Sequence, residues 1–484
     1  MNLDDALSGR AKLEGIQWLL LSASPRRVLR DQLKSLLSSR GLLGPCRLRR
    51  ARFKPGRKLT AFYDVLVRTA GSAAYCSRPI AVTWEGNGKT NQRPGEHYVA
   101  EIEAEARRRS VAGPFGKLKA DVVPWNMHIS VSPLDIDFIQ LVRFIDPSYV
   151  SDMLAVAYQR SGLALDRSHR GTYTVISIRY RPGQRHVLRY DRLDAAKTTV
   201  FAKFYTGEDG KRVFHVATQA TEWLAQHAKG VAAVRPLAYL PEHNVVLYPG
   251  LSGTPLTKSL RRRDRGLARW LEQTGRALHA LHLLPPAVAG PLPCHDFAAE
   301  VGQTARASAH IGVLLPPVGA TISALLDRAR ELHDRLPQEP PTLTHGDFKP
   351  EHVWCGPGGL TLLDFDSCHC GDPALDIGKF LAHLRLWHVL NDQPGLGAAQ
   401  ERFLAGYAGS VPRERLVRAR LYEAVELIKI TARRVPLFGP DWVLRTERLI
   451  GRAHGAMNDV QIMVGPPATR PSPVIPAKEH AAHA

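Results

Sequence analysis

The sequence predicts an α+β fold in which a sheet-forming part is followed by a mainly helical part. Three observations support this prediction. Two similar segments, at residues 52–64 and 179–191, place Pro-Gly between runs rich in aromatic and branched residues, which is typical of β-hairpins. Strand-like apolar runs follow both segments, and helical periodicity dominates from about residue 265 onward. The 484 residues are too many for one ordinary core and are enough for two or three domains.

The two hairpin segments, RFKPGRKLTAFYD and RYRPGQRHVLRYD, belong to a larger repeated pattern. Each copy has a helical pattern before the hairpin, and a strand and a second helical pattern after it. These elements are expected at residues 28–39, 80–84 and 98–108 in the first copy and at residues 148–160, 200–205 and 214–227 in the second. The repeated order indicates a duplication, with chance similarity of two basic hairpins as the alternative. Lys203 in the second copy has Thr83 as its counterpart in the first, so only one copy carries the lysine.

The second half of the chain is expected to be mainly helical. A strand ending in a Gly/Pro-rich loop, LYPGLSGTPL, precedes the change of periodicity. Helices are then expected at residues 265–285, 376–389, 400–408, 413–434 and 442–456.

Bulk composition favours a globular protein, with 44% hydrophobic and 23% charged residues. The start, MNLDDALSGR, lacks the basic and apolar regions of a signal peptide, and no apolar run reaches the roughly 18 residues of a spanning helix. We therefore expect a cytoplasmic protein without membrane contact. The six cysteines are scattered, which favours free thiols; a metal site near Cys368 and Cys370 is the minor alternative.

The net charge of +20 allows an acidic partner such as a nucleic acid or a nucleotide. The densest basic stretch, residues 26–58, has a single acid, Asp31, and few aromatic residues. A solvated basic face is therefore favoured, and nucleic-acid binding is the minor alternative. The oligomeric state is left open.

Lys203 lies inside an apolar strand, VFAKFY, where an ammonium group needs a charged partner. Glu222 is the only acid between Asp209 and Glu242, so it is the sole candidate for that partner on the following helix. A lysine on an edge strand facing water is the alternative.

Two acidic loops follow later in the chain. Asp347 lies in HGDFKPEH, and Asp364 lies in LLDFDSCHCGDPALDIG. A short strand pair between these loops would place both carboxylates at one opening, where they would repel each other unless a cation lay between them. Phosphoryl transfer needs this set of groups: a carboxylate for the hydroxyl, a metal ligand and a lysine for the phosphates.

These motifs, together with the hinge segment LYPGLSGTPL and the helix GRALHALHLLP, resemble the aminoglycoside phosphotransferase and choline kinase family of protein-kinase-like enzymes. The resemblance covers residues 171–456. It implies a bilobal fold with an antiparallel-sheet N-lobe, a helical C-lobe, and ATP and Mg²⁺ between them. The residues that it implies are Asp347 as catalytic base, Asp364 as chief Mg²⁺ ligand with Asp366 as a second acid, Lys203 and Glu222 as the phosphate-holding pair, Tyr248, Pro249 and Gly250 as the adenine hinge, and His345, Asp372 and Asp376 as braces of the loops.

Four segments are expected. The duplicated pattern predicts that residues 1–120 form an α+β domain, a possible degenerate N-lobe repeat, and residues 121–250 are expected to form the kinase-like N-lobe. Residues 251–464 form the helical C-lobe with the catalytic and metal loops, and residues 465–484, rich in Pro and Ala, form a disordered tail. The first segment is expected to contribute packing or substrate enclosure rather than chemistry.

Three features depart from the common pattern of such enzymes. No GxGxxG covers the phosphates, and the turn at Pro182 and Gly183 takes that place. Lys349 follows Asp347 by two positions, as in protein kinases, where that lysine contacts the transferred phosphate. His352 stands where Asn is usual. Mg²⁺ prefers oxygen ligands, so His352 suits Mn²⁺ better.

His352 leaves three interpretations open: a one-metal site held by Asp364, an altered metal preference, or a pseudoenzyme. We favour the first, because Asp347, Asp364 and Lys203 are all present. If His352 binds metal, activity is expected to fall as it takes up a proton below about pH 6.5.

The leading hypothesis is therefore ATP-dependent transfer of a phosphoryl group to a hydroxyl of a small molecule, such as an aminoglycoside, a sugar or an amino alcohol. A nucleotide-binding protein with weak or no activity is the second hypothesis, because of His352. A protein kinase is the third, because of Lys349, although no APE motif follows the DFD segment.

Overall fold

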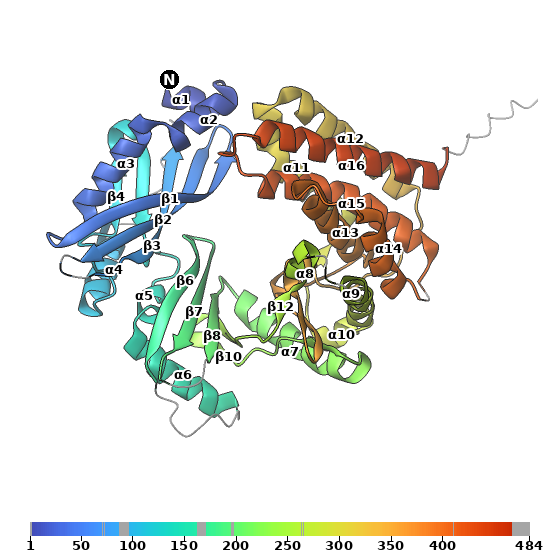
Figure 1. Ribbon diagram of the computed structural model, residues 1–484, viewed down its shortest axis with the longest axis horizontal. Helices are drawn as coiled ribbons and strands as arrows, with labels where there is room; N and C mark the ends of the chain where they lie inside the picture. The colour runs from blue at the N-terminus through green and yellow to red at the C-terminus, as the bar shows by residue number, and fades with distance from the viewer. Residues whose placement is uncertain are drawn as a thin grey trace, which may run out of the picture.

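The computed structural model describes residues 2–69, 71, 73–86, 96–161, 171–194, 198–262, 264, 266–409 and 411–466. Figure 1 shows two β-sheets on one side of the molecule and a helical lobe on the other. The chain passes from the first sheet to the second and then into the helical lobe. Within the described part of the chain, none of the helices combines the length and apolar content that crossing a membrane requires.

The first sheet has five strands in the order β1-β2-β3-β5-β4, all antiparallel. Its strands are β1 (Gly41–Lys54), β2 (Lys58–Thr69), β3 (Cys76–Glu85), β4 (Lys119–Val122) and β5 (Met127–Val131). Alternate residues of β2 are buried, as expected for a strand with one face on the core. The helices of this part are α1 (Leu3–Ser8), α2 (Lys12–Leu21), α3 (Ala23–Leu36) and α4 (Glu96–Arg108).

The second sheet also has five antiparallel strands, in the order β6-β7-β8-β11-β10. Its strands are β6 (Tyr173–Arg181), β7 (Arg185–Arg192), β8 (Thr199–Phe204), β10 (Ala238–Leu240) and β11 (Val245–Pro249). Two helices, α5 (Leu141–Phe144) and α6 (Pro147–Ser161), precede it, and α7 (Asp209–His227) lies between β8 and β10 in the chain. The β6–β7 turn needs Gly183, whose φ of 68° is unfavourable for other residues.

The two sheets share more than strand order. A 3₁₀ turn joins the last two strands of each sheet, η1 (Val123–Trp125) in the first and η2 (Pro241–His243) in the second. Each turn ends at an asparagine in the left-handed conformation, Asn126 and Asn244. In the first sheet, β4 and β5 extend to Val131, beyond the boundary at residue 120 that the sequence predicted. The physical reason is the antiparallel pairing of β5 with β3 and of β4 with β5.

The helical lobe contains nearly all of the remaining described elements. Its helices are α8 (Leu256–Arg262), α9 (Leu267–His282), α10 (Pro286–Ala289), α11 (Phe297–Leu314), α12 (Pro316–Asp334), α13 (Ala374–Leu390), α14 (Leu396–Tyr407), α15 (Arg413–Arg434) and α16 (Trp442–Val464). Two small sheets connect this lobe to the second sheet. One has the order β12-β15-β16-β9 and the other β13-β17-β14. Their strands are β9 (Val231–Ala233), β12 (Thr254–Pro255), β13 (Cys294–His295), β14 (Thr342–Thr344), β15 (Val353–Gly356), β16 (Gly359–Leu362) and β17 (His369–Gly371).

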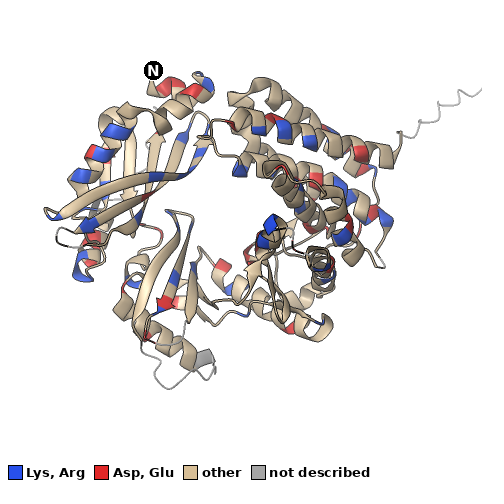
Figure 2. Ribbon diagram, viewed as in Figure 1, with Lys and Arg blue, Asp and Glu red and all other residues tan. Residues whose placement is uncertain are grey.

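The first sheet packs against both other parts. Buried residues of α1, α2 and the first sheet join the same apolar cluster as those of the helical lobe. On its other side, Ala81 and Phe62 pack into the cluster that fills the space between α5, α6 and the second sheet. The three parts are therefore arranged around a central region, and Figure 2 shows Lys and Arg positions on strands of both sheets.

The predicted tail begins at residue 465. Gly465 and Pro466 follow α16, and residues 467–484 lie outside the described residues. The expectation of disorder there stays a prediction.

Candidate active site

The HGD loop lies between β14 and β15 and is shaped by its glycine. Gly346 has a φ of 73°, and a Cβ at this position would clash with the carbonyl oxygen of Ser367. Only glycine fits both constraints. The loop then turns through η3 (Pro350–His352) into β15, so that Asp347 and His352 lie on the same side.

Asp376, at the start of α13, holds this loop in place. Its carboxylate accepts hydrogen bonds from the backbone N–H groups of His345 (2.6 Å) and Gly346 (2.8 Å). His282 Nε2 lies 3.1 Å from the same carboxylate, which is fully buried. His345 Nε2 in turn bonds the carbonyl oxygen of Leu363 at 2.9 Å, which ties the catalytic loop to the loop of Asp364. Buried polar groups that are satisfied in this way make a loop rigid.

Asp364 follows β16 in a strained conformation. Its φ of 68° lies in the left-handed region, which is uncommon for a residue with a side chain and recurs at functional sites. The carboxylate accepts a hydrogen bond from Lys203 Nζ at 2.7 Å. Burial raises the pKa of Asp364, but the Lys203 ammonium outweighs it, and the pKa is well below the usual value. Asp364 is therefore a carboxylate at neutral pH.

Asp366 is almost completely buried next to Asp364 and has three partners of its own. Lys203 Nζ is 3.2 Å from its carboxylate, Tyr205 donates its hydroxyl at 2.7 Å, and Arg185 forms an ion pair. Burial and the charge of Asp364 raise the pKa of Asp366. Burial alone would lower the pKa of Lys203, but the two carboxylates raise it, so the ammonium stays charged.

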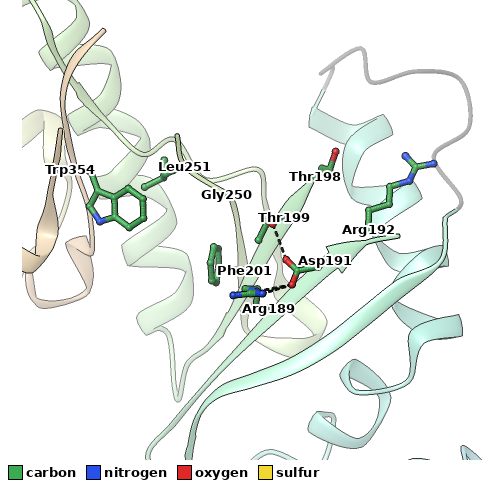
Figure 3. A pocket seen from close by; sticks show the side chains of 9 residues that line it. All are labelled: Arg189, Asp191, Arg192, Thr198, Thr199, Phe201, Gly250, Leu251 and Trp354. Carbon is green, nitrogen blue, oxygen red and sulfur yellow. Dashed lines mark hydrogen bonds and ion pairs between the residues drawn. The ribbon is translucent and has the colours of Figure 1, made fainter. Parts of the chain in front are cut away.

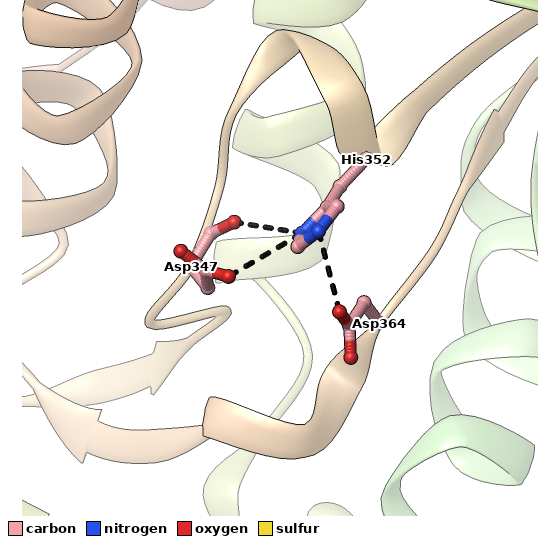
Figure 4. A group of neighbouring side chains, drawn as sticks. All are labelled: Asp347, His352 and Asp364. Carbon is pink, nitrogen blue, oxygen red and sulfur yellow. Dashed lines mark hydrogen bonds and ion pairs between the residues drawn. The ribbon is translucent and has the colours of Figure 1, made fainter. Parts of the chain in front are cut away.

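His352 points its two ring nitrogens at different partners (Figure 4). Nδ1 lies 3.0 Å from the backbone carbonyl oxygen of Asp347, and a carbonyl can only accept, so Nδ1 carries the hydrogen. Nε2 lies 3.2 Å from a carboxylate oxygen of Asp364. Burial lowers the pKa of His352 to about 3, so Nε2 presents a lone pair to that oxygen at neutral pH. Two facing lone pairs repel, and a cation between them removes the repulsion.

The donor atoms of Asp347, His352 and Asp364 lie within 4.8 Å of one another, close enough to share one metal ion. The residues present thus fit a divalent cation. This group of candidate ligands includes Asp347, which was not among the predicted metal ligands. The predicted ligand Asp366 instead contacts Lys203, Tyr205 and Arg185.

Asp347 also contacts Lys349, whose ammonium pairs with its carboxylate. Burial raises the pKa of Asp347, but the Lys349 charge outweighs it, and the pKa falls below the usual value. The Asp347 side chain keeps 34% of its surface exposed, so a second molecule can reach it. An ionised, accessible carboxylate beside an ammonium can accept a hydrogen bond from a hydroxyl while the ammonium faces a phosphate.

A cavity of about 470 Å³ lies next to these groups. Its lining residues come from both lobes and are shown in Figure 3: Arg189, Asp191, Arg192, Thr198, Thr199, Phe201, Gly250, Leu251 and Trp354. Phe201 precedes Lys203 by two positions on β8, and side chains two apart on a strand share a face. Trp354 lies on β15, two positions after His352, the last residue of η3. The cavity therefore borders the face of β8 that carries Lys203.

The predicted hinge residues lie at the end of β11, beside this cavity. Gly250 lines the cavity, and its backbone N–H donates to the carbonyl oxygen of Thr199 at 2.7 Å. The ring of Tyr248 instead packs under Lys203, with Nζ 5.2 Å from the ring centre. Pro249 pairs with Val200 and leads into the hinge.

The predicted pair of Lys203 and Glu222 is not formed. Glu222 forms an ion pair with Arg235 at 3.3 Å, and both side chains are exposed. The buried positions of α7 follow a 3–4 spacing that includes Val216, Ala220 and Leu224, so Glu222 falls on the outer side of the helix. Lys203 instead pairs with Asp364 and Asp366, in the loop that follows β16.

Asp372 lies where a brace was predicted. It accepts from the backbone N–H of Ala374 at 2.9 Å and from Arg418 Nε at 2.8 Å, which joins the start of α13 to α15. Together with His345 and Asp376, it holds the two acidic loops against the helical lobe.

Four residues of the site were missed from the sequence: Arg185, Tyr205, Phe201 and Trp354. Arg185 follows the Pro182–Gly183 turn that replaces a glycine-rich loop, so its position in the hairpin was a usable signal. Phe201 could have been found by counting two positions back from Lys203 along its strand. Trp354 follows the turn that ends at His352, so strand spacing gave no signal for it. Tyr205 lies directly after β8 and gave no such signal.

Comparisons with known proteins bear on the same region. A family model described as the phosphotransferase enzyme family matches residues 177–417. No curated protein sequence matches the chain.

Several solved structures overlap with the chain at low identity. The GDP complex of wild-type aminoglycoside 2′-phosphotransferase-IIIa has a TM-score of 0.40 and 12% identity, and the overlap covers 64% of this chain and 97% of that one. Spectinomycin phosphotransferase with ADP and spectinomycin has a TM-score of 0.42 and 14% identity, and the overlap covers 66% of this chain and 94% of that one. A choline/ethanolamine kinase family protein from Mesorhizobium loti has a TM-score of 0.40 and 17% identity, and the overlap covers 63% of this chain and 95% of that one.

Proposed function

Because residues 177–417 belong to the phosphotransferase enzyme family, we propose that this protein moves the γ-phosphoryl group of ATP to a hydroxyl of a small molecule. One observation carries the proposal. Lys203, Asp364 and Asp347 come from distant parts of the chain and converge next to a cavity of about 470 Å³. This is the set of charges that phosphoryl transfer requires.

The nucleotide base is proposed to occupy the cavity between Phe201 and Trp354, with the backbone of Gly250 at its edge. Lys203 lies two positions beyond Phe201, about 7 Å further along the strand. That offset suits a nucleotide whose base lies on Phe201 and whose phosphates reach Lys203. Arg185 would hold the same phosphates from the hairpin side, because it already contacts Asp366.

Asp347 is proposed to orient the acceptor. Its carboxylate accepts the hydrogen bond of the attacking hydroxyl and takes the proton as the oxygen bonds to phosphorus and the bond to the ADP oxygen breaks. Lys349 faces the transferred phosphoryl group from the same side. His345, Asp372 and Asp376 act through the loops and do not touch the substrate.

A divalent cation fits between Asp364, His352 and Asp347, and when bound it would neutralise charge on the phosphates. The proposed residue set favours Mn²⁺ more than an all-oxygen set does, because His352 supplies a nitrogen. Mg²⁺ stays the proposed physiological ion.

The proposed acceptor is a small hydroxyl compound, and the cytoplasm, where ATP is abundant, is the proposed location. Acceptor turnover would be tested by ATP consumption over a library of sugars, amino alcohols, aminoglycosides and their phosphates, in Mg²⁺ and in Mn²⁺. We expect at least one acceptor to be phosphorylated. The Asp364→Asn variant should lose the thermal stabilisation that metal–ATP gives the wild-type protein.

Equal stabilisation of the wild-type protein and Asp364→Asn would contradict the role of Asp364. Nucleotide binding without transfer to any acceptor would favour a binding protein without activity. Phosphate that appears on added proteins but on no small molecule would favour a protein kinase.

A further inference from the structure

A group of arginines gathers where the first sheet, the β6–β7 hairpin and the end of α15 meet. We call it the arginine group; its members are Arg50 and Arg52 on β1, Arg179 and Arg181 on β6, and Arg433 and Arg434 at the end of α15. Figure 2 shows basic positions on β1 and on the hairpin that faces it.

Two contacts bring the elements of the arginine group together, and a third joins α15 to the loop of Asp347. Arg50 Nη2 donates to the backbone carbonyl oxygen of Arg433 at 3.3 Å, which joins β1 to α15. Arg52 Nη1 donates to the side chain of Gln184 at 2.8 Å, which joins β1 to the hairpin turn. Arg434 forms an ion pair with Glu351 at 3.0 Å.

Most of the charges in the arginine group are not neutralised by the protein. Among the described residues, no aspartate or glutamate forms an ion pair with Arg50, Arg52, Arg179, Arg181 or Arg433. Burial lowers the pKa of Arg50 to about 10, and the charges of Arg52 and Arg434 add to this effect. Burial and the charges of Arg52 and Arg50 lower the pKa of Arg181 to about 9. Like charges held together in half-buried positions destabilise a protein unless an anion joins them.

The arginine group adjoins the proposed acceptor side of the site. Glu351, which pairs with Arg434, lies in η3 of the catalytic loop, four positions after Asp347. Arg181 pairs across the hairpin with Arg185, so both side chains leave the same face of the sheet, and Arg185 contacts Asp366. The hydroxyl-binding carboxylate and the arginines thus border the same region.

A helix C-terminus favours basic residues, which accounts in part for Arg433 and Arg434 at the end of α15. That effect falls off within the last turn and does not reach the strands. The helix terminus therefore does not explain the arginines of β1 and β6, which come from two different sheets.

We propose that the arginine group binds an anionic group of the acceptor, so that the substrate is a small hydroxyl compound that already carries a phosphate. Guanidinium groups bind phosphate through paired hydrogen bonds, and several around one anion give both affinity and orientation. The inference rests on the proposed function and names its substrate class. It also assigns a task to the first sheet, which supplies Arg50 and Arg52. Polycationic aminoglycosides are poor substrates on this account.

The test measures the binding of inorganic phosphate to the full-length protein by calorimetry, with the nucleotide site filled by AMP-PNP and Mg²⁺. We expect the wild-type protein to bind phosphate. Arg52→Gln, Arg181→Gln and Arg433→Gln should each weaken binding about tenfold, as the loss of one charged hydrogen bond predicts. Arg402→Gln, which removes an exposed arginine of α14, is the matched control and should leave it unchanged.

A second measurement compares turnover of paired acceptors, ribose with ribose 5-phosphate and glycerol with glycerol 3-phosphate. Where a pair is turned over, the phosphorylated member should be preferred at least about tenfold, and Arg52→Gln should reduce that preference while the KM for ATP stays the same. Circular dichroism and melting temperature establish that each variant is folded.

Failure of the inference can be told apart from failure of the proposed function. A protein that binds AMP-PNP but not phosphate, or binds phosphate equally well in all variants, overturns the inference and leaves the proposed function standing. A protein that binds phosphate through the arginine group but never binds nucleotide overturns the proposed function. A short single-stranded oligonucleotide that displaces phosphate and binds far more tightly would make the arginine group a nucleic-acid surface and overturn the inference.

Discussion

The first and second sheets have the same strand order, but they differ at one matching position. The second sheet carries Lys203 there, which contacts two carboxylates, and the first sheet carries Thr83. Lys203 on β8 pairs with Val246, two positions after Asn244. Thr83 on β3 pairs with His128, two positions after Asn126. The structural register thus makes Thr83 the counterpart of Lys203, as the sequence predicted.

The surroundings of the two positions differ. Lys203 Nζ contacts Asp364 and Asp366, which reach it from the helical lobe. The Thr83 hydroxyl contacts the hydroxyl of Thr60, at 3.2 Å on the neighbouring strand. The same scaffold therefore supports a charged centre only where an acidic loop meets it. We propose that the two sheets arose by duplication and that the first kept the fold and lost the chemistry.

The largest expected effect separates Lys203 from Thr83. Lys203→Ala should lower kcat/KM for ATP by about 100-fold or more, because it removes the cation that we propose holds the phosphates. Thr83→Ala should change it less than about twofold, since only one hydroxyl contact is lost. Steady-state kinetics on both variants checks this, and similar losses in the two would erase the distinction between the sheets.

Stability should not distinguish the sheets, because matching core positions are buried in both. Trp84, which pairs with Met127, and Phe204, which pairs with Val245, are each almost fully buried. Trp84→Ala and Phe204→Ala should each lower the free energy of unfolding by about 3–5 kcal/mol. Denaturant unfolding measures this. If Trp84→Ala left the free energy of unfolding unchanged, the first sheet would not contribute to the stability of the protein, and the expectation would be wrong.

A smaller effect is expected at the hairpin turns. Arg185 contacts Asp366, and its counterpart Lys58 pairs across the equivalent hairpin with Lys54. Arg185→Gln should raise the KM for ATP about tenfold, because a charged hydrogen bond near the phosphates is lost. Lys58→Gln should change that KM less than about twofold. A larger effect at Lys58 would place the nucleotide phosphates nearer the first sheet.

The smallest expected effect concerns pH and His352, which has no counterpart in the first sheet. Because burial lowers the pKa of His352 to about 3, the ring stays neutral across the working pH range. The fall in activity below about pH 6.5 that the sequence suggested is therefore not expected. The kcat/KM profiles of the wild-type protein and His352→Asn should share the same acid limb, while the ratio of Mn²⁺ to Mg²⁺ activity falls in the variant.

The free energy of unfolding, unlike the activity, is expected to depend on the protonation of His352. An unfolded histidine takes up a proton near pH 6.5, so the neutral His352 of the fold costs stability as the pH falls below that value. If the acid limb of the kinetic profile moves in His352→Asn, the ring titrates in the active protein, and its assignment as a neutral ligand is wrong.

Much of this arrangement could be predicted from the sequence. The phosphotransferase family of residues 177–417 and the α+β fold are confirmed. Motifs such as HGD and GDPALDIG leave little freedom in the loops that they form. The helical pattern at residues 413–434 coincides with α15 as observed. Strong periodicity over many residues is the most reliable local signal.

Other features depend on packing that no local pattern encodes. The strands β4 and β5 are short, and β5 pairs with β3 although α4 lies between them in the chain, so the first sheet extends further than its repeat suggested. The partner of Lys203 was placed on α7 because Glu222 was the only acid available there, yet the helix turns it outward. The arginine group joins residues more than 380 positions apart, as in the contact of Arg50 with Arg433.

The central claim is that the second sheet and the acidic loops form one phosphoryl-transfer site, with Asp347 as the group that orients the hydroxyl. The most direct measurement follows a single turnover of γ-labelled ATP by the wild-type protein and by Asp347→Asn, with nucleotide affinity determined in parallel. The account predicts that Asp347→Asn changes nucleotide affinity by no more than a few-fold relative to the wild-type protein and slows phosphoryl transfer by about 100-fold or more. Unchanged transfer by Asp347→Asn would contradict it.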